Sequence, residues 1–174
     1  MVNVNTPILS LPPAIGSLTG TEVIPLVQAG TTKSATTKQL GSVVITANFP
    51  ATIEYVMDGG GSVLTIGMKG YLVVPFNCTI QSVTLLSDKV SSISVDIWKT
   101  TQTAFDAGIT SPTSANSITS VSPPTIASTT KYFDQSLVNW ISSLGQSDVL
   151  AFNIISINNV ARATLSLQCQ RSLL

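Results

Sequence analysis

The side chains that could carry out chemistry in this sequence are few and widely spaced. The chain of 174 residues contains no histidine, so a serine or cysteine nucleophile activated by an imidazole base is impossible. Cys78 and Cys169 are its only thiols, and two isolated cysteines cannot complete the ligand set of a usual zinc site. We therefore expect two buried free thiols, with no metal and no cofactor, and the sequence leaves open whether Cys78 and Cys169 approach each other.

Carboxylates are the remaining catalytic candidates, because glycan-degrading enzymes can use a pair of Asp or Glu residues. The sequence holds two glutamates, Glu22 and Glu54, and six aspartates, and none of them forms a close pair along the chain. Such residues commonly face solvent or cap turns. We therefore expect no catalytic residue, and we predict that the protein is not an enzyme.

The glycine-rich run Asp58-Gly59-Gly60-Gly61 is the one motif that hints at an ion or phosphate loop. A phosphate loop needs a lysine and a following helix, and a calcium loop needs several more carboxylates. Since both sets of partners are missing, we predict a plain turn.

Composition limits the partners of the protein. Charged residues make up 9% of the chain, and eight Lys and Arg balance eight Asp and Glu, so nucleic acid is not an expected partner. No window approaches the apolar length of a membrane span, and Pro7, Pro12 and Pro13 interrupt an N-terminus that lacks the charge of a signal peptide. The surface must be covered largely by Ser, Thr, Asn and Gln, which suits packing against other chains.

The N-terminal part is predicted to be extended. Prolines in residues 1–20 remove backbone donors that a helix or central strand needs, so we expect an arm there. Two β-prone runs then meet at Ala29-Gly30, which predicts a small hairpin, with Pro25 confining its strand to an edge. We place the arm and hairpin in residues 1–49 and a single β domain in residues 50–174.

Short runs of Val, Ile, Leu and Thr, closed by Gly, Pro, Asn or Asp, predict consecutive antiparallel strands in the second part. The apolar positions change parity between Ile80 and Val83, which indicates a bulge or burial on both faces. The predicted strands cover residues 52–58, 62–67, 69–76, 78–86, 91–99, 148–156 and 160–170.

Residues 100–147 are rich in Ser, Thr, Pro and Asn, so we predict long loops with short strands around 117–121 and 126–129. Long loops are places where a binding surface can be built. Apolar residues at helical spacing predict one or two helical turns within this region, at Leu137, Trp140, Ile141 and Leu144.

Trp98 lies on the polar face of the predicted strand 91–99, opposite Ile93, Val95 and Ile97. Its ring either packs under a loop or a neighbouring subunit, or forms an exposed platform for a sugar or a receptor. We favour packing, because large aromatic side chains are highly buried on average. The candidates for a contact with another subunit or a receptor are Trp98, Asp96 and Trp140.

The residue pattern of positions 11–42 resembles a short segment near the N-termini of many tailed-bacteriophage virion proteins. These positions read LPPAIGSLTGTEVIPLVQAGTTKSATTKQLGS. In that family the segment precedes a different C-terminal module and helps to mount the protein on the particle. The resemblance implies that a set of residues in the arm and hairpin serves virion mounting: Leu11, Pro12, Leu18, Val23, Pro25, Val27 and Gln28.

The second part is similar to a β-sandwich module of phage fibre-like and head-decoration proteins. The ordered string that carries the resemblance is DGGG, KGYL, VPF, CTI and VDIWK, followed by SLVNWISSL, SDVLAFNI and VARATLSLQ. The departure from the family's pattern is GQSD at residues 145–148, where a Gly often directly precedes the Asp. The expected fold is therefore all-β, an antiparallel, jelly-roll-like β-sandwich preceded by the extended arm and its hairpin.

These resemblances imply a non-catalytic structural protein of the virion, assembled in the host cytoplasm and attached to capsid or tail proteins. By analogy with phage fibres and decorations we expect a homotrimer, acting as a decoration or cement protein or as a short fibre-like protein. The alternative is a receptor-binding tail-fibre or adaptor protein that recognises a host surface glycan. A glycan-degrading enzyme is a third hypothesis, for which the sequence offers no site.

Overall fold

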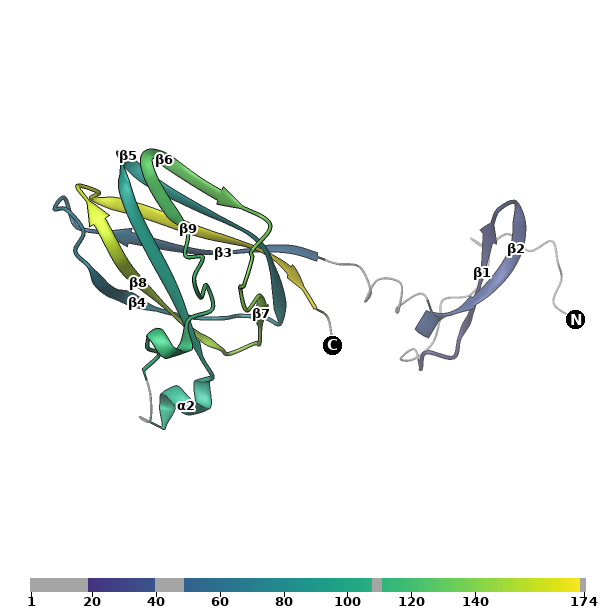
Figure 1. Cartoon of the computed structure of the whole chain (residues 1–174). Coiled ribbons are helices and arrows are strands. Elements are labelled where there is room, and N and C mark those ends of the chain that lie inside the picture. Colours follow the sequence, from purple (N-terminus) through teal and green to yellow (C-terminus); the bar gives the residue numbers. More distant parts are fainter. Residues whose placement is uncertain (1–18, 40–48, 108–110, 173–174) are drawn as a thin grey trace, which may run out of the picture. The chain divides into compact units, whose positions relative to one another are not determined.

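The computed structural model describes residues 19–39, 49–107 and 111–172. The chain divides into two compact units, Met1–Ala47 and Asn48–Leu174, and each is considered by itself (Figure 1). Most of the predicted N-terminal arm therefore lies outside the described residues.

The first unit contains a two-stranded antiparallel sheet of β1 (Val23–Gln28) and β2 (Thr31–Thr36). Ala29 and Gly30 join the strands with positive φ angles of 51° and 73°, the backbone twist that a two-residue hairpin turn requires. The register pairs Val23 with Thr36 and Gln28 with Thr31. The predicted hairpin and its turn are confirmed.

The second unit is built from antiparallel strands, which confirms the all-β class (Figure 1). Among the described residues of this unit, seven strands form one sheet in the order β3-β9-β5-β8-β4, with β6 and β7 also paired to β5. Two short helices follow β5, α2 (Gln102–Asp106) and the 3₁₀ helix η2 (Ser114–Asn116). The strands are β3 (Phe49–Asp58), β4 (Gly67–Val73), β5 (Cys78–Thr100), β6 (Thr125–Asp134), β7 (Ser143–Leu144), β8 (Val149–Asn158) and β9 (Arg162–Arg171).

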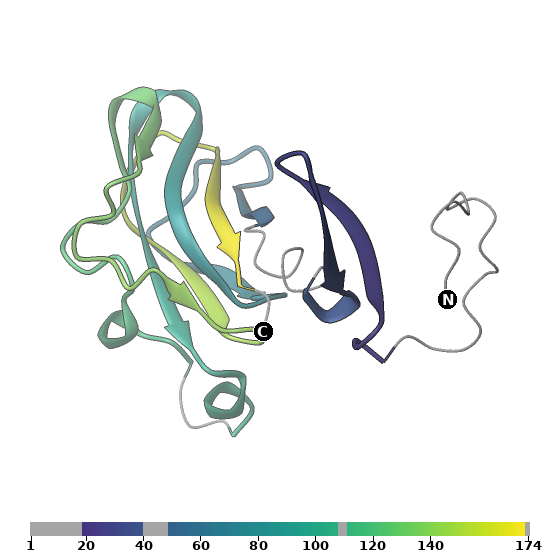
Figure 2. The same cartoon turned by 90° about the vertical axis from the view of Figure 1, so that its right-hand side faces the viewer.

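The long strand β5 organises the sheet. Its first half pairs with β9 and its second half with β8, so β8 and β9 together form one antiparallel partner along its 23 residues. Strand β6 likewise pairs with both halves of β5. The sheet curls along this axis, as the arc of β5 in Figure 2 shows.

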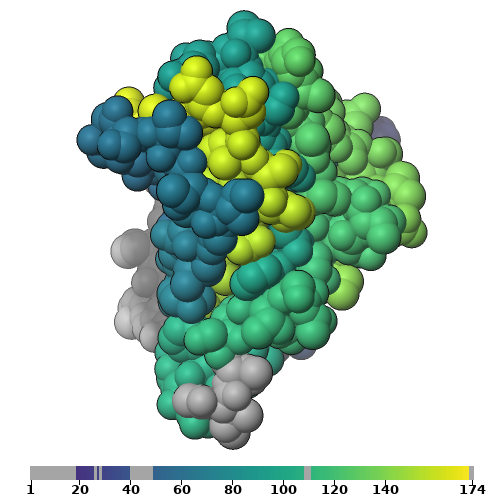
Figure 3. Space-filling model, turned by 60° about the vertical axis from the view of Figure 1, so that its left-hand side comes forward, coloured from purple at the N-terminus to yellow at the C-terminus, as the bar shows by residue number. Residues whose placement is uncertain are grey.

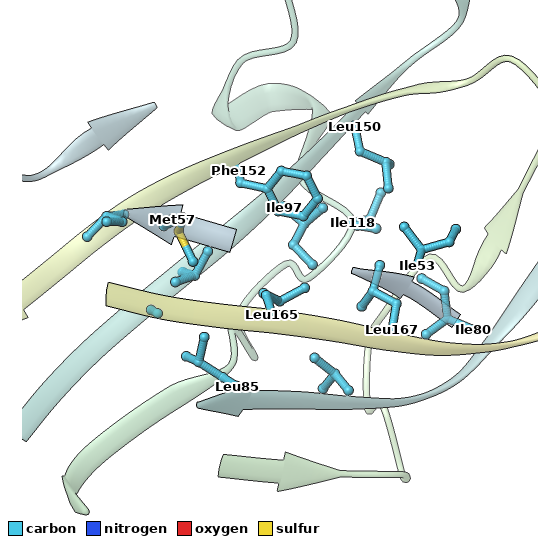
Figure 4. Close-up of a cluster of buried hydrophobic side chains, with 14 of the residues drawn as sticks. Ile53, Met57, Ile80, Leu85, Ile97, Ile118, Leu150, Phe152, Leu165 and Leu167 are labelled. Atoms are coloured by element: carbon cyan, nitrogen blue, oxygen red, sulfur yellow. The ribbon is translucent and has the colours of Figure 1, made fainter. Parts of the chain in front are cut away.

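The curl closes around a single apolar core (Figure 4). Tyr55 of β3 stacks on Phe152 of β8 with a ring-centroid distance of 4.1 Å, although β3 and β8 are not neighbours in the sheet. Most of the largest fully buried side chains come from the strands, and two of them, Val74 and Ile118, lie outside the strands. Those in strands are Phe152, Leu85, Ile93, Ile97, Ile126, Leu144, Leu150, Ile154, Leu165 and Leu167.

Several local predictions are confirmed. The register of β5 against β9 shifts between Ile80 and Ser82, which is the predicted bulge. Strands β8 and β9 occupy the predicted positions on either side of a turn at Asn158 and Asn159. The Asp58-Gly59-Gly60-Gly61 run is a turn, in which the Asp58 carboxylate accepts a hydrogen bond from the Gly60 amide at 2.9 Å.

Other local predictions are wrong. Residues 62–66 form no strand, and the two strands predicted at 78–86 and 91–99 are one continuous strand. Residues 117–121 contribute only an isolated bridge, between Ser117 and Trp98.

The helix predicted at Leu137 to Leu144 is also absent. Asp134 accepts hydrogen bonds from the amides of Ser136 and Leu137, which turns the chain directly after β6. Leu137 and Asn139 have φ angles of 46° and 66°, which a right-handed helix cannot contain. Leu137, Trp140 and Leu144 pack against the core without a helix, whereas Ile141 is 54% exposed. The jelly-roll-like sandwich stays a prediction.

Candidate functional site

Asp96 and Trp98, two candidates for partner contact, belong to a hydrogen-bonded network on the outer side of β5. Asp96 is 8% exposed. One carboxylate oxygen accepts the indole N–H of Trp98 at 2.6 Å, and the other accepts the hydroxyls of Ser117 at 2.7 Å and Thr119 at 2.6 Å. The carboxylate thus joins β5 to the loop that follows η2, and this loop covers it on the polar face of the strand.

Trp98 and Trp140 are both half-buried, and both indole N–H groups are used within the chain. The Trp140 N–H donates to the Ser122 carbonyl at 2.9 Å. Trp140 thus binds the loop after η2 near Ser122, whereas Asp96 binds the same loop at Ser117 and Thr119. Trp98 pairs in register with Ala151 of β8, which is fully buried. The rings therefore pack within the second unit and keep only part of their surface for any partner.

The predicted mounting residues fall into two groups. Leu11, Pro12 and Leu18 lie outside the described residues. The others lie in β1, where Val23 and Val27 are 65% and 73% exposed and Pro25 is exposed. Gln28 ends the strand opposite Thr31, and its side chain is not described. The described apolar residues of this set thus face solvent within the first unit.

The carboxylates act mainly as acceptors in turns and ion pairs. Asp58 binds the Arg162 guanidinium at 2.8 Å, and hydrogen bonds from Gly60 and Arg162 lower the pKa of Asp58. The Ser136 hydroxyl and amide lower the pKa of Asp134 in the same way. Asp148 accepts the Gly145 amide at 2.8 Å and lies 3.5 Å from the Lys99 ammonium. Each of these groups has a structural partner from its own chain.

The two thiols come together on neighbouring strands. Cys78 lies opposite Arg171, and Cys169 lies opposite Ile80, so the cysteines are diagonal neighbours across β5 and β9. Both are buried and free. Burial, with a contribution from Cys78, raises the pKa of the Cys169 thiol to about 12, and burial raises the pKa of Cys78. Both sulfurs are therefore protonated and poorly nucleophilic at neutral pH.

Within the described part of the chain, no three His, Cys, Asp or Glu side chains gather where they could hold a metal ion. None of the helices described there has the length and apolar character needed to cross a lipid bilayer.

A row of exposed apolar side chains runs along the edge strand β4. We call it the apolar edge, and it consists of Ile66, Met68, Tyr71 and Val73. Strand β4 ends the sheet order, so its outer backbone groups face no neighbouring strand among the described residues. Figure 3 shows the blue part of the second unit, which includes β3 and β4, at the surface; the strand that pairs with the yellow residues of β9 is β3.

The sequence pattern did not indicate the apolar edge. Edge strands are commonly protected by charged residues or proline, and β4 carries Lys69 as its single charge. The signal that could have found it is the near absence of charge in residues 62–76, together with the glycines on either side of Lys69.

Comparison with protein-family models, with curated proteins and with solved structures returned no match to this chain.

Proposed function

We propose that this chain is a non-catalytic structural protein of a tailed-phage virion, a decoration or cement protein or a short fibre-like protein. It attaches to the capsid or tail through its N-terminal arm, which includes the hairpin. The family resemblance of both parts of the sequence supports this proposal. The structural observation that carries it is the exposure of apolar side chains on the hairpin, of which Val23 and Val27 are the most exposed.

An isolated two-stranded hairpin is marginally stable in water, because it has no second layer to cover its apolar face. The register places Val23, Pro25 and Val27 on one face of the hairpin. Their cross-strand neighbours on that face carry no charge: Thr36, Ser34 and Thr32. A partner surface of matching neutral and apolar character would cover this face and stabilise the hairpin.

We also propose that the second unit is a jelly-roll-like sandwich that assembles as a homotrimer. The apolar edge supports self-association, because an exposed edge strand with apolar side chains can pack against another subunit. The low charge of the chain removes much of the repulsion that would oppose such packing.

Quantitative mass spectrometry of purified particles tests the virion assignment. A copy number in the hundreds supports a decoration or cement protein, whereas a few copies support the receptor-binding alternative. A recombinant chain that is monomeric and absent from particles overturns the proposal.

The mounting role is tested by the double substitution Val23→Asp and Val27→Asp, which places two charges on the neutral hairpin face. We expect particles assembled with this variant to lack the protein. Val90→Asp is the matched control, because Val90 is a similarly exposed valine in the second unit. Unchanged incorporation of the double variant would refute mounting through this face.

A further inference from the structure

The outer face of the sheet contains an open recess that no sequence motif indicated. It has a volume of about 320 Å³, and it is lined by Pro50 of β3, Gln81 of β5, and Gln168, Cys169 and Gln170 of β9. One lining residue, Gln81, is the extra residue of the bulge between Ile80 and Ser82, where β5 departs from regular pairing with β9.

The glutamine amides in the recess retain free hydrogen-bonding capacity. The Gln168 oxygen accepts the Thr52 hydroxyl at 3.0 Å, and the Gln81 amide group reaches the Thr79 carbonyl only at 3.4 Å. Among the described residues, no hydrogen bond engages the Gln170 side chain or the Gln168 NH₂ group. Each glutamine amide offers two donor hydrogens and one acceptor oxygen. The recess therefore presents donors and acceptors side by side.

The recess differs from the two tryptophan sites in this respect. The Asp96 carboxylate and the indole N–H groups of Trp98 and Trp140 are all engaged inside the protein. The face of the second unit around Gln168 and Gln170 thus holds polar groups that are available to a ligand.

The lining also restricts the chemistry of that ligand. No residue that lines the recess carries a charge, so a phosphate or a carboxylate would find no counter-ion there. An extended peptide could not add as a strand over the recess, since β9 is already paired on both sides, with β3 and with β5. A small neutral ligand fits this lining when it offers hydroxyl groups to the amides and C–H groups to the apolar part of the surface.

We propose that this recess binds one residue of a neutral saccharide. Adjacent hydroxyls of a sugar both donate and accept hydrogen bonds, as do the amides of Gln81, Gln168 and Gln170. The Pro50 ring supplies an apolar wall for the C–H groups of the sugar. The volume lies at the lower end of the range of small-molecule sites. This inference does not depend on the proposed virion role.

An array of immobilised oligosaccharides, probed with the full chain, tests the proposal. The array carries neutral hexose and N-acetylhexosamine oligosaccharides beside sialylated and sulfated ones. We expect binding to a subset of the neutral oligosaccharides. The tightest of these would then be titrated in solution by calorimetry, and loss of the Gln170 amide in Gln170→Ala should weaken binding about ten-fold.

Gln102→Ala is the matched control, because Gln102 is an exposed glutamine in α2 far along the chain from the recess. It should bind like the wild type. Gln81→Ala provides a second recess variant, and thermal unfolding of every variant identifies any that fails to fold. The proposal is overturned if no neutral oligosaccharide binds, if the acidic oligosaccharides bind equally well, or if both recess variants keep wild-type affinity.

Discussion

Asp96 shows how a carboxylate on a strand can become a structural centre at the scale of a single residue. The alternation of the strand places it opposite the apolar face, yet Ser117 and Thr119 cover it and donate hydroxyl hydrogen bonds. With the Trp98 indole, three donors satisfy one buried charge. A buried charge is costly unless hydrogen bonds compensate it, so the loop and the strand depend on each other.

We expect Asp96→Ala to destabilise the protein by about 2–3 kcal/mol, because it leaves the indole N–H and the Thr119 hydroxyl without their acceptor. Urea unfolding measures the change. Asp106→Ala is the control, since Asp106 is exposed in α2 and should change stability by less than about 0.5 kcal/mol. Equal stability of the two variants would show that the network contributes nothing.

Glu22 makes a second local prediction, in the first unit. Hydrogen bonds from the Thr19 amide and hydroxyl, and from the Thr37 hydroxyl, hold the pKa of Glu22 well below its usual range. Because the folded pKa is lowered, the stabilisation is present above the unfolded pKa of about 4.3 and is lost as the pH falls from there toward the folded value.

An NMR titration of the full chain should therefore show the Glu22 side chain still ionised at pH 4. The Thr19 and Gly20 amide signals should move only at lower pH, when their acceptor becomes protonated. In Glu22→Gln this movement should disappear. A Glu22 carboxyl that titrates at its ordinary value would contradict the hydrogen bonds from Thr19 and Thr37.

At the scale of elements, β5 determines how the sheet is built. The sequence around Asp88 looks like a strand end, but the backbone continues, and the pairing passes from β9 to β8. The Asp88 carboxylate accepts the Ala161 amide at 3.2 Å, which ties β5 to the turn between β8 and β9. Asp88, although aspartate normally favours turns, thus lies within a continuous strand, at the point where the pairing of β5 passes from β9 to β8.

Gly70 in β4 lies directly against the side chain of Tyr55 from β3. A Cβ atom at this position would lie 2.1 Å from the Tyr55 hydroxyl oxygen, and Tyr55 cannot move freely because it stacks on Phe152. We expect Gly70→Ala to destabilise the protein by about 1–3 kcal/mol in urea unfolding.

Tyr55→Phe removes the hydroxyl that causes the clash and provides the matched background. The double variant of Tyr55→Phe and Gly70→Ala should recover part of the loss, with an interaction energy above about 0.5 kcal/mol. Strictly additive effects would mean that the contact between β3 and β4 across the core does not limit the fold.

At the scale of the whole molecule, the second unit combines a well-packed core with a surface of low charge. Its apolar residues are not all buried, since the apolar edge on β4 remains exposed. Large exposed apolar patches commonly mark interaction sites. The proposed trimer therefore requires that subunits associate through this edge.

We expect Val73→Lys to shift the assembled protein toward monomer in sedimentation velocity experiments. Val73 is 54% exposed, so the substitution should leave the monomer folded. Val90→Lys, on a more exposed valine in β5, is the control and should assemble like the wild type. If Val73→Lys assembles normally, β4 is not part of the interface.

The sequence alone was sufficient for the strand class, the hairpin and the Asp58 turn, whereas after Ile80 it left a bulge and burial on both faces open, and the register of β5 against β9 decided for the bulge. The strand class, the hairpin and the turn each depend on local chemistry, namely alternation along a strand or the conformational preferences of Gly, Asn and Asp. The inward positions of β3 and β9 follow the same alternation, since Ile53, Met57, Leu165 and Leu167 are buried.

Only the tertiary structure decided which segments pair and what covers them. The continuity of β5, the absence of a helix near Trp140 and the burial of Asp96 all depend on partners distant in sequence. The same holds for the recess, where Pro50, Gln81 and Gln168 meet from three strands. Side-chain periodicity encodes which face of a strand is apolar, but it does not encode the register or the loops that complete a site.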